Sequence, residues 1–185
     1  MRKCIYYVTV SADGFIATEE GSTHWMSGAP RSDYGFGAFY ESISTILMGR
    51  KTYEKILDIS KDSYFPYEDK EVYVASRSND YDTHSQEVGL IAQDNLAQEI
   101  ARLKLQNKDG DIWVAGGAEF ATELLELGLI DEVHIFMQPL LLGSGISLFS
   151  KLEKPRTLRL ATCEKWPGDI VELRYLTVKS WRVDI

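Results

Sequence analysis

The sequence has few cysteines and no excess of positive charge. Its 185 residues include only two cysteines, Cys4 and Cys163, which are far apart and form no C-x-x-C pair. This spacing predicts neither a zinc site nor a disulfide framework. The formal net charge of −8 argues against a nucleic-acid partner, because proteins that bind nucleic acid usually present a basic face.

Long apolar runs are also missing. No window approaches the roughly 18 consecutive apolar residues that a membrane-spanning helix needs, and the start of the chain, residues 1–7, is too short and too polar for a secretory signal. We therefore expect a cytoplasmic protein without a membrane partner. None of the three histidines has a second ligand at a useful spacing, so no metal site is expected.

The remaining composition is that of an ordinary globular protein. Hydrophobic residues make up 44% of the chain and charged residues 26%. The chain is long enough to bury a core without covalent cross-links. It has no internal repeat, low-complexity tract or linker, so residues 1–185 are expected to form one domain.

Buried strands alternate with helical segments along most of the chain. Strands are expected at 4–10, 45–48, 72–75, 88–92, 112–115 and 130–139, and helices after residue 32 and at 50–57, 95–105 and 119–129. Segments 157–165 and 170–179 flank a Trp-Pro-Gly-Asp turn and predict a hairpin. This order indicates an α/β fold, in which a mostly parallel sheet lies between helices and ends in antiparallel strands at one edge.

Two joints between a strand and a helix contain glycine. One strand ends in Gly116-Gly117, and another ends in Gly49. A glycine at such a joint leaves backbone N–H groups free at the positive end of the helix, which is typical of a pyrophosphate site. The alternative, that these glycines are purely structural, stays open. Many such glycines serve only to tighten a turn, and no G-x-G-x-x-G is present.

Taken together, the motifs resemble the dihydrofolate reductase superfamily, in particular the bacterial branch related to the C-terminal reductase domain of riboflavin biosynthesis. The matching segments are 11–17, 46–54, 74–77, 114–117 and 129–132, followed by Pro139, Gly143 and Phe149. They occur in the family's order and span most of the chain. The resemblance implies a three-layer α/β/α sandwich with NADPH lying across the carboxyl ends of the strands.

The resemblance also implies which residues meet the cofactor. The turn beside the phosphates is expected at Gly49, Arg50, Lys51 and Thr52, the pocket of the adenosine 2′-phosphate at Ser76 and Arg77, and the pyrophosphate turn at Gly116, Gly117, Ala118 and Glu119. In relatives the bond between the paired glycines is often cis. Arginine suits a phosphate because its planar donors bind two oxygens at once. The alternative is that these cations are ordinary solvated loop charges.

A carboxylate on the first helix is implied as the substrate-facing acid. In the family it precedes the glycine of the Met-Gly-Arg turn by sixteen residues, and counting back from Gly49 gives Asp33. Burial would raise the pKa of Asp33, as a catalytic acid requires, whereas the alternative role is to complement the helix dipole. Trp25, with His24 beside it, is expected to line the substrate pocket unless its ring packs on the core.

Two departures from the family bear on the substrate. Folate enzymes have an arginine two residues after a loop proline, but Pro66 is followed there by Glu68, which would repel a carboxylate. The riboflavin-pathway reductases use basic residues around the first helix to hold a ribose phosphate, whereas Arg31 is followed here by Asp33 and Glu41. We therefore predict an NADPH-dependent reductase that transfers a hydride to a small heterocyclic or carbonyl substrate. The alternatives are a 5-amino-6-(5-phosphoribosylamino)uracil reductase and a non-catalytic NADP-binding module.

The C-terminal hairpin also bears on assembly. Together with the apolar segment 133–137 it offers a surface that could pair between subunits. Relatives are often homodimers, so a homodimer is expected. The sequence does not indicate which face is used.

Overall fold

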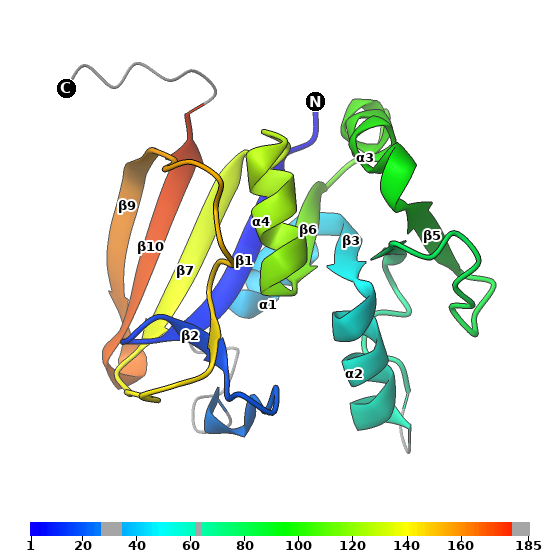
Figure 1. Ribbon diagram of the computed structural model, residues 1–185. Coiled ribbons are helices and arrows are strands. Elements are labelled where there is room, and N and C mark those ends of the chain that lie inside the picture. The colour runs from blue at the N-terminus through cyan, green and yellow to red at the C-terminus, as the bar shows by residue number, and fades with distance from the viewer. Residues whose placement is uncertain (27–34, 62–63, 179–185) are drawn as a thin grey trace.

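A central sheet of eight strands organises the chain (Figure 1), in the order β5-β4-β3-β6-β1-β7-β10-β9. The structure is a computed structural model that describes residues 1–26, 35–61 and 64–178. The strands are β1 Cys4–Ser11, β3 Ile43–Gly49, β4 Glu71–Ser76, β5 Val88–Ala92, β6 Asp111–Gly116, β7 Glu132–Gln138, β9 Leu158–Trp166 and β10 Ile170–Thr177. The strands from β5 to β7 are parallel, and β10 and β9 are antiparallel. The predicted mixed sheet is therefore confirmed.

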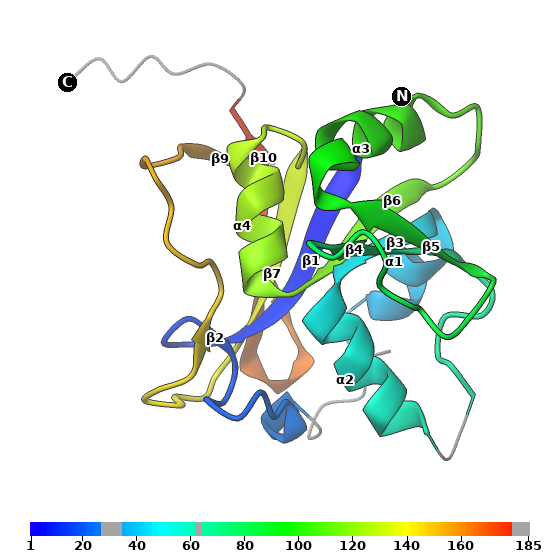
Figure 2. The ribbon, with the colours of Figure 1, turned by 45° about the vertical axis from the view of Figure 1, so that its right-hand side comes forward.

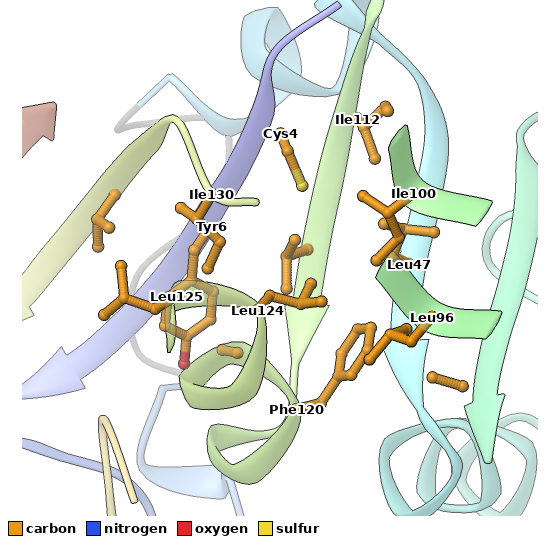
Figure 3. Close-up of a cluster of buried hydrophobic side chains, with 14 of the residues drawn as sticks. Cys4, Tyr6, Leu47, Leu96, Ile100, Ile112, Phe120, Leu124, Leu125 and Ile130 are labelled. Atoms are coloured by element: carbon orange, nitrogen blue, oxygen red, sulfur yellow. The ribbon is translucent and has the colours of Figure 1, made fainter. Parts of the chain in front are cut away.

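Helices cover both faces of this sheet (Figures 1 and 2). They are α1 Phe36–Ser42, α2 Arg50–Ser60, α3 Leu96–Leu105 and α4 Ala118–Glu126. On one face, α3 and α4 cover a core in which Leu124 packs with Tyr6 and Leu47 (Figure 3). On the other face, α1 and α2 pack on Tyr7 and Met48, the next residues along the same two strands. Successive strand residues point to opposite faces, so each central strand supplies both cores.

The sequence places the end of α4 three residues too late. Gly128 has a φ of +68°, which only glycine adopts readily. The backbone N–H groups of Gly128 and Leu129 bond to the carbonyls of Leu125 and Leu124, the pattern that closes a helix. The helix therefore ends at Glu126 and leaves room for the turn into β7.

A second, two-stranded sheet was only partly predicted. It pairs β2, Phe15–Ala17, with β8, Ile146–Ser147, a strand that directly follows the glycine-bearing segment 140–145, for which the sequence predicts a turn. Gly145 permits this contact, because a Cβ there would lie only 2.2 Å from the carbonyl oxygen of Ala17. The pairing brings the turn after β7 against the segment that follows β1.

The C-terminal hairpin forms one edge of the large sheet. Most of β9 is exposed, including Cys163, whereas Cys4 in β1 is fully buried. Burial raises the pKa of the Cys4 thiol to about 12. In the part of the chain that the structure describes, no strand pairs with the outer side of β9. The homodimer stays a prediction. No helix within these ranges is long and apolar enough to cross a membrane.

Arg2 is a buried cation that the sequence did not single out. Its side chain is only 5% exposed. Nε donates to the carbonyl of Gly110 at 2.7 Å, and Nη2 donates to the hydroxyls of Ser44 at 2.9 Å and Thr45 at 2.6 Å. Nη1 reaches the carbonyl of Leu103 at 3.4 Å. One guanidinium therefore ties the end of α3 to the starts of β3 and β6.

This arrangement predicts a large loss of stability in Arg2→Met, which leaves several buried acceptors without a donor. We expect the free energy of unfolding to fall by at least about 2 kcal/mol, measured by urea denaturation. Arg102→Met removes an exposed arginine that pairs with Glu99 and should cost less than about 1 kcal/mol. Equal losses in the two variants would contradict the role given to Arg2.

Candidate functional site

The carboxyl ends of β3 and β6 meet at the point where the chain changes faces. The two strands are parallel neighbours, and Met48 pairs with Gly116 at their ends. After β3 the chain enters α2, which packs on the core containing Tyr7, whereas after β6 it enters α4, on the core containing Tyr6. Figure 2 shows the two helices leaving this point in different directions. Ligands of open α/β sheets bind at such a switch point.

The two glycine turns touch each other across this point. A Cβ at Gly49 would lie 3.3 Å from the Cβ of Phe120 and 3.9 Å from the backbone nitrogen of Gly117. A Cβ at Gly117 would lie 3.2 Å from the Thr52 hydroxyl. The bond between Gly116 and Gly117 is cis, as the resemblance implies. The structure therefore brings both predicted phosphate turns together.

Both helices that start here have free N-termini. The N-cap residues are Gly49 for α2 and Gly117 for α4, and within the described residues neither helix has a side-chain cap. At Gly116, φ is +116°, and a Cβ would meet no atom of the described chain within 4 Å. Two uncapped helix ends beside an open space supply the N–H donors that a pyrophosphate accepts. This donor set fits a dinucleotide.

Two cations from different turns lie beside α4. Lys51 Nζ is 3.5 Å from Oε1 of Glu119, and Arg77 Nη2 is 4.0 Å from Oε2 of the same carboxylate. Ser76 is buried, and its hydroxyl oxygen accepts the N–H of Ser78 at 3.1 Å. The predicted residues at the ends of β3, β4 and β6 therefore form one cluster.

Arg50 is placed differently from its neighbours in the α2 turn. Its Nε lies 3.6 Å from Glu54, one turn along the same helix. Its guanidinium carbon lies 5.6 Å from the centre of the Tyr81 ring. The structure therefore gives Arg50 two partners outside the cluster around Glu119.

An aromatic cluster lies between α1 and the sheet. The Tyr7 ring stacks on Phe39 of α1 with centroids 4.1 Å apart, and both rings meet the Trp113 ring nearly at right angles. The next residue of α1 is Tyr40, whose hydroxyl donates to Asp69 at 2.5 Å. The acid that follows Glu68 is therefore held against the first helix.

The predicted substrate residues are only partly placed. Trp25 lies in a short 3₁₀ helix, His24–Met26, and its buried indole nitrogen has no hydrogen-bond acceptor among the described residues. Asp33 and Arg31 fall in 27–34, outside the described residues. His134 is buried in β7 with its Nε2 2.9 Å from Glu132, so it belongs to the sheet as predicted.

Comparison with known proteins identifies the family. The model of the RibD C-terminal domain matches residues 2–171. The chain belongs to the RibD C-terminal domain family. It is 38% identical to the uncharacterized protein YwjB of Bacillus subtilis over 95% of this chain and 98% of that one. A solved protein of Shewanella sp. PV-4 assigned to riboflavin biosynthesis superposes with a TM-score of 0.79 at 26% identity, over 97% of this chain and 100% of the other.

The fold is also that of dihydrofolate reductase. The enzyme from Enterococcus faecalis, solved in complex with NADP(H), superposes with a TM-score of 0.63 over 95% of this chain and 96% of its own. At 15% identity this likeness concerns the fold alone. The dihydrofolate-reductase-like α/β/α sandwich that the sequence predicted is thereby confirmed for this RibD C-terminal domain.

A cavity of about 310 Å³ lies at the opposite edge of the sheet. Its lining residues are Met1, Arg2, Lys3, Asp131, Glu132, Leu176 and Thr177. They come from the starts of β1 and β7 and the end of β10. This cavity is therefore remote from the two glycine turns, which lie at the carboxyl ends of the strands.

Asp13 holds together two loops at the carboxyl ends of β1 and β7. Its carboxylate accepts the N–H of Gly143 at 2.7 Å, the N–H of Leu142 at 3.1 Å and the Ser11 hydroxyl at 2.5 Å. The Ser11 hydroxyl and these N–H groups lower the pKa of Asp13. From the sequence alone, the Asp-Gly pair indicates only a local turn, because the partner of Asp13 lies 130 residues away.

These hydrogen bonds predict that Asp13→Ala loosens the loops that follow β1 and β7. Limited proteolysis should cut the variant faster within 140–146 than the wild-type protein. Asp82→Ala is the control, since this exposed carboxylate accepts the backbone N–H of the nearby His84. Because the pKa of Asp13 is lowered, wild-type protection should persist through neutral pH and disappear only as the pH falls through that lowered value. Unchanged cleavage of Asp13→Ala would contradict this prediction.

Proposed function

We propose that this protein is an NADPH-dependent reductase of a small heterocyclic or carbonyl compound. The observation that carries the proposal is the meeting of two uncapped helix N-termini, at Gly49 and Gly117, where the chain changes faces of the sheet. Backbone N–H groups and helix dipoles at this point favour a pyrophosphate. Support comes from the RibD family and from the fold it shares with a dihydrofolate reductase that was solved with NADP(H).

The preference for NADPH over NADH rests on the cations beside the glycine turns. Arg77 follows β4, next to β3, so its guanidinium is available to a phosphate on the adenosine ribose. Lys51 adds a second positive charge from the start of α2. The Thr52 hydroxyl lies against Gly117 and is positioned to donate to the pyrophosphate. When bound, NADPH would supply the hydride, and these residues would hold and orient it.

Arg77→Ala should therefore discriminate between the two nucleotides. We expect the Kd for NADPH to rise by about tenfold or more, the loss for one charge-assisted contact, and the Kd for NADH to stay unchanged. Quenching of the fluorescence of the four tryptophans reports binding. Arg159→Ala in the exposed edge strand is the matched control. A protein that binds neither nucleotide at millimolar concentration would contradict the proposed function.

The substrate is constrained by acids around the first helix. Asp69 is held by Tyr40 at one end of α1, and Glu68 beside it is exposed. Like charges repel, so these acids would disfavour a substrate tail that carries a carboxylate and reaches them. Phe39 of α1 stacks on the buried ring of Tyr7, so the first helix is fixed against an aromatic part of the core. Asp33 is proposed as the acid that anchors and protonates this compound.

Replacing Asp33 by asparagine tests that assignment. NADPH oxidation should be screened with pterins, pyrimidines and quinones, and the best acceptor used for both proteins. We expect kcat to fall by about a hundredfold, the usual contribution of a positioned acid, while the Kd for NADPH stays unchanged. Asp82→Asn, on a loop remote from the first helix in sequence, is the control. Full turnover in Asp33→Asn would remove Asp33 from the catalytic step.

A second candidate is the 5-amino-6-(5-phosphoribosylamino)uracil reductase reaction of riboflavin biosynthesis. Family membership favours it, because the model matches residues 2–171. The acids around the first helix, Asp33 and Glu41, argue against it, since they stand where basic residues would hold the ribose phosphate. Including this phosphoribosyl pyrimidine in the acceptor screen separates the two. A non-catalytic NADP-binding module would bind NADPH but oxidise it with none of these acceptors.

A further inference from the structure

Glu119 occupies the place where a phosphate is expected. It lies in the first turn of α4, two residues after the N-cap Gly117. Its two carboxylate oxygens reach different cations, Lys51 of α2 at 3.5 Å and Arg77 of the turn after β4 at 4.0 Å. One carboxylate therefore joins the three segments that were expected to share a bound dinucleotide.

The carboxylate resembles a ligand phosphate in what it contacts. An anion at the start of a helix is stabilised by the helix dipole, and the two cations add a direct attraction. The carboxylate of Glu119 makes both of these favourable interactions, with the helix dipole and with the two cations, without any ligand. A phosphate of the nucleotide would compete with Glu119 for Lys51 and Arg77, and it would be repelled by any carboxylate that stayed beside them.

Glu119 is held loosely enough to be displaced. The side chains of Lys51, Glu119 and Arg77 are 81%, 64% and 83% exposed. Exposed ion pairs contribute about 0 to 1 kcal/mol each, because water and salt screen them. The carboxylate can rotate away at small cost, but its charge stays close to the ligand. The effect on binding should therefore be a moderate penalty rather than a block.

We propose that Glu119 is a specificity-determining residue that reduces the preference of this site for NADPH over NADH. This inference rests on the proposed function. In the free protein Glu119 neutralises part of the positive charge of Lys51 and Arg77. NADPH carries the additional phosphate and needs these cations most, so it bears the larger penalty. NADH has only the pyrophosphate and is affected less.

The substitution Glu119→Gln tests the charge, since glutamine has the same size and no charge. NADPH and NADH are titrated against the wild-type protein and the variant, with tryptophan fluorescence as the readout. We expect the affinity for NADPH to rise by about three- to tenfold and the affinity for NADH to change by less than about twofold. Raising the salt concentration should shrink the gain.

The matched control is Asp58→Asn at the far end of α2. Asp58 is 68% exposed and lies 3.5 Å from Lys61, so it is also an exposed carboxylate in a loose ion pair. It removes the same charge from the molecule and should leave both affinities unchanged. Thermal unfolding of each variant checks that the fold is intact.

Three outcomes would overturn the proposal. If Glu119→Gln binds NADPH no better than the wild-type protein, Glu119 imposes no penalty. If NADH gains as much as NADPH, Glu119 acts on the pyrophosphate and does not determine specificity. In both cases NADPH still binds, so the proposed function stands. If no protein binds either nucleotide, the proposed function and this inference fail together.

Discussion

The contact between the two glycine turns is the constraint on which the site depends. Gly49 leaves just enough room for Phe120, and Gly117 for the Thr52 hydroxyl, so α2 and α4 can start side by side. The strands that lead to them are neighbours, but the helices cover opposite faces. Side chains at either glycine would push the helix starts apart and separate the donors that together suit an anion.

Local patterns in the sequence were enough to predict the strands of the large sheet, most helices and both glycine turns. The apolar runs that end at Gly49 and Gly116 are short-range signals, and the matching motifs occur in order along the chain. The contacts made by Arg2 and Asp13 could not be predicted this way. Each joins segments about a hundred or more residues apart, and no local periodicity reports such a partner.

The sequence indicated which residues would lie at the candidate site but not how their charges are arranged. Lys51, Arg77 and Glu119 were all expected beside the cofactor, yet the sequence does not reveal that the acid lies between the two cations. That arrangement depends on the approach of β3, β4 and β6 to one another. Glu119 therefore offsets part of the positive charge of Lys51 and Arg77.

The two cysteines differ in a way that makes the chain convenient to study. Cys4 is enclosed by the core and its thiol is kept protonated, whereas Cys163 stands in the open on the outermost strand. Thiol reagents attack the deprotonated, accessible sulfur. A maleimide dye should therefore attach at a single position in the folded protein, on the hairpin edge, and report whether two molecules approach each other there.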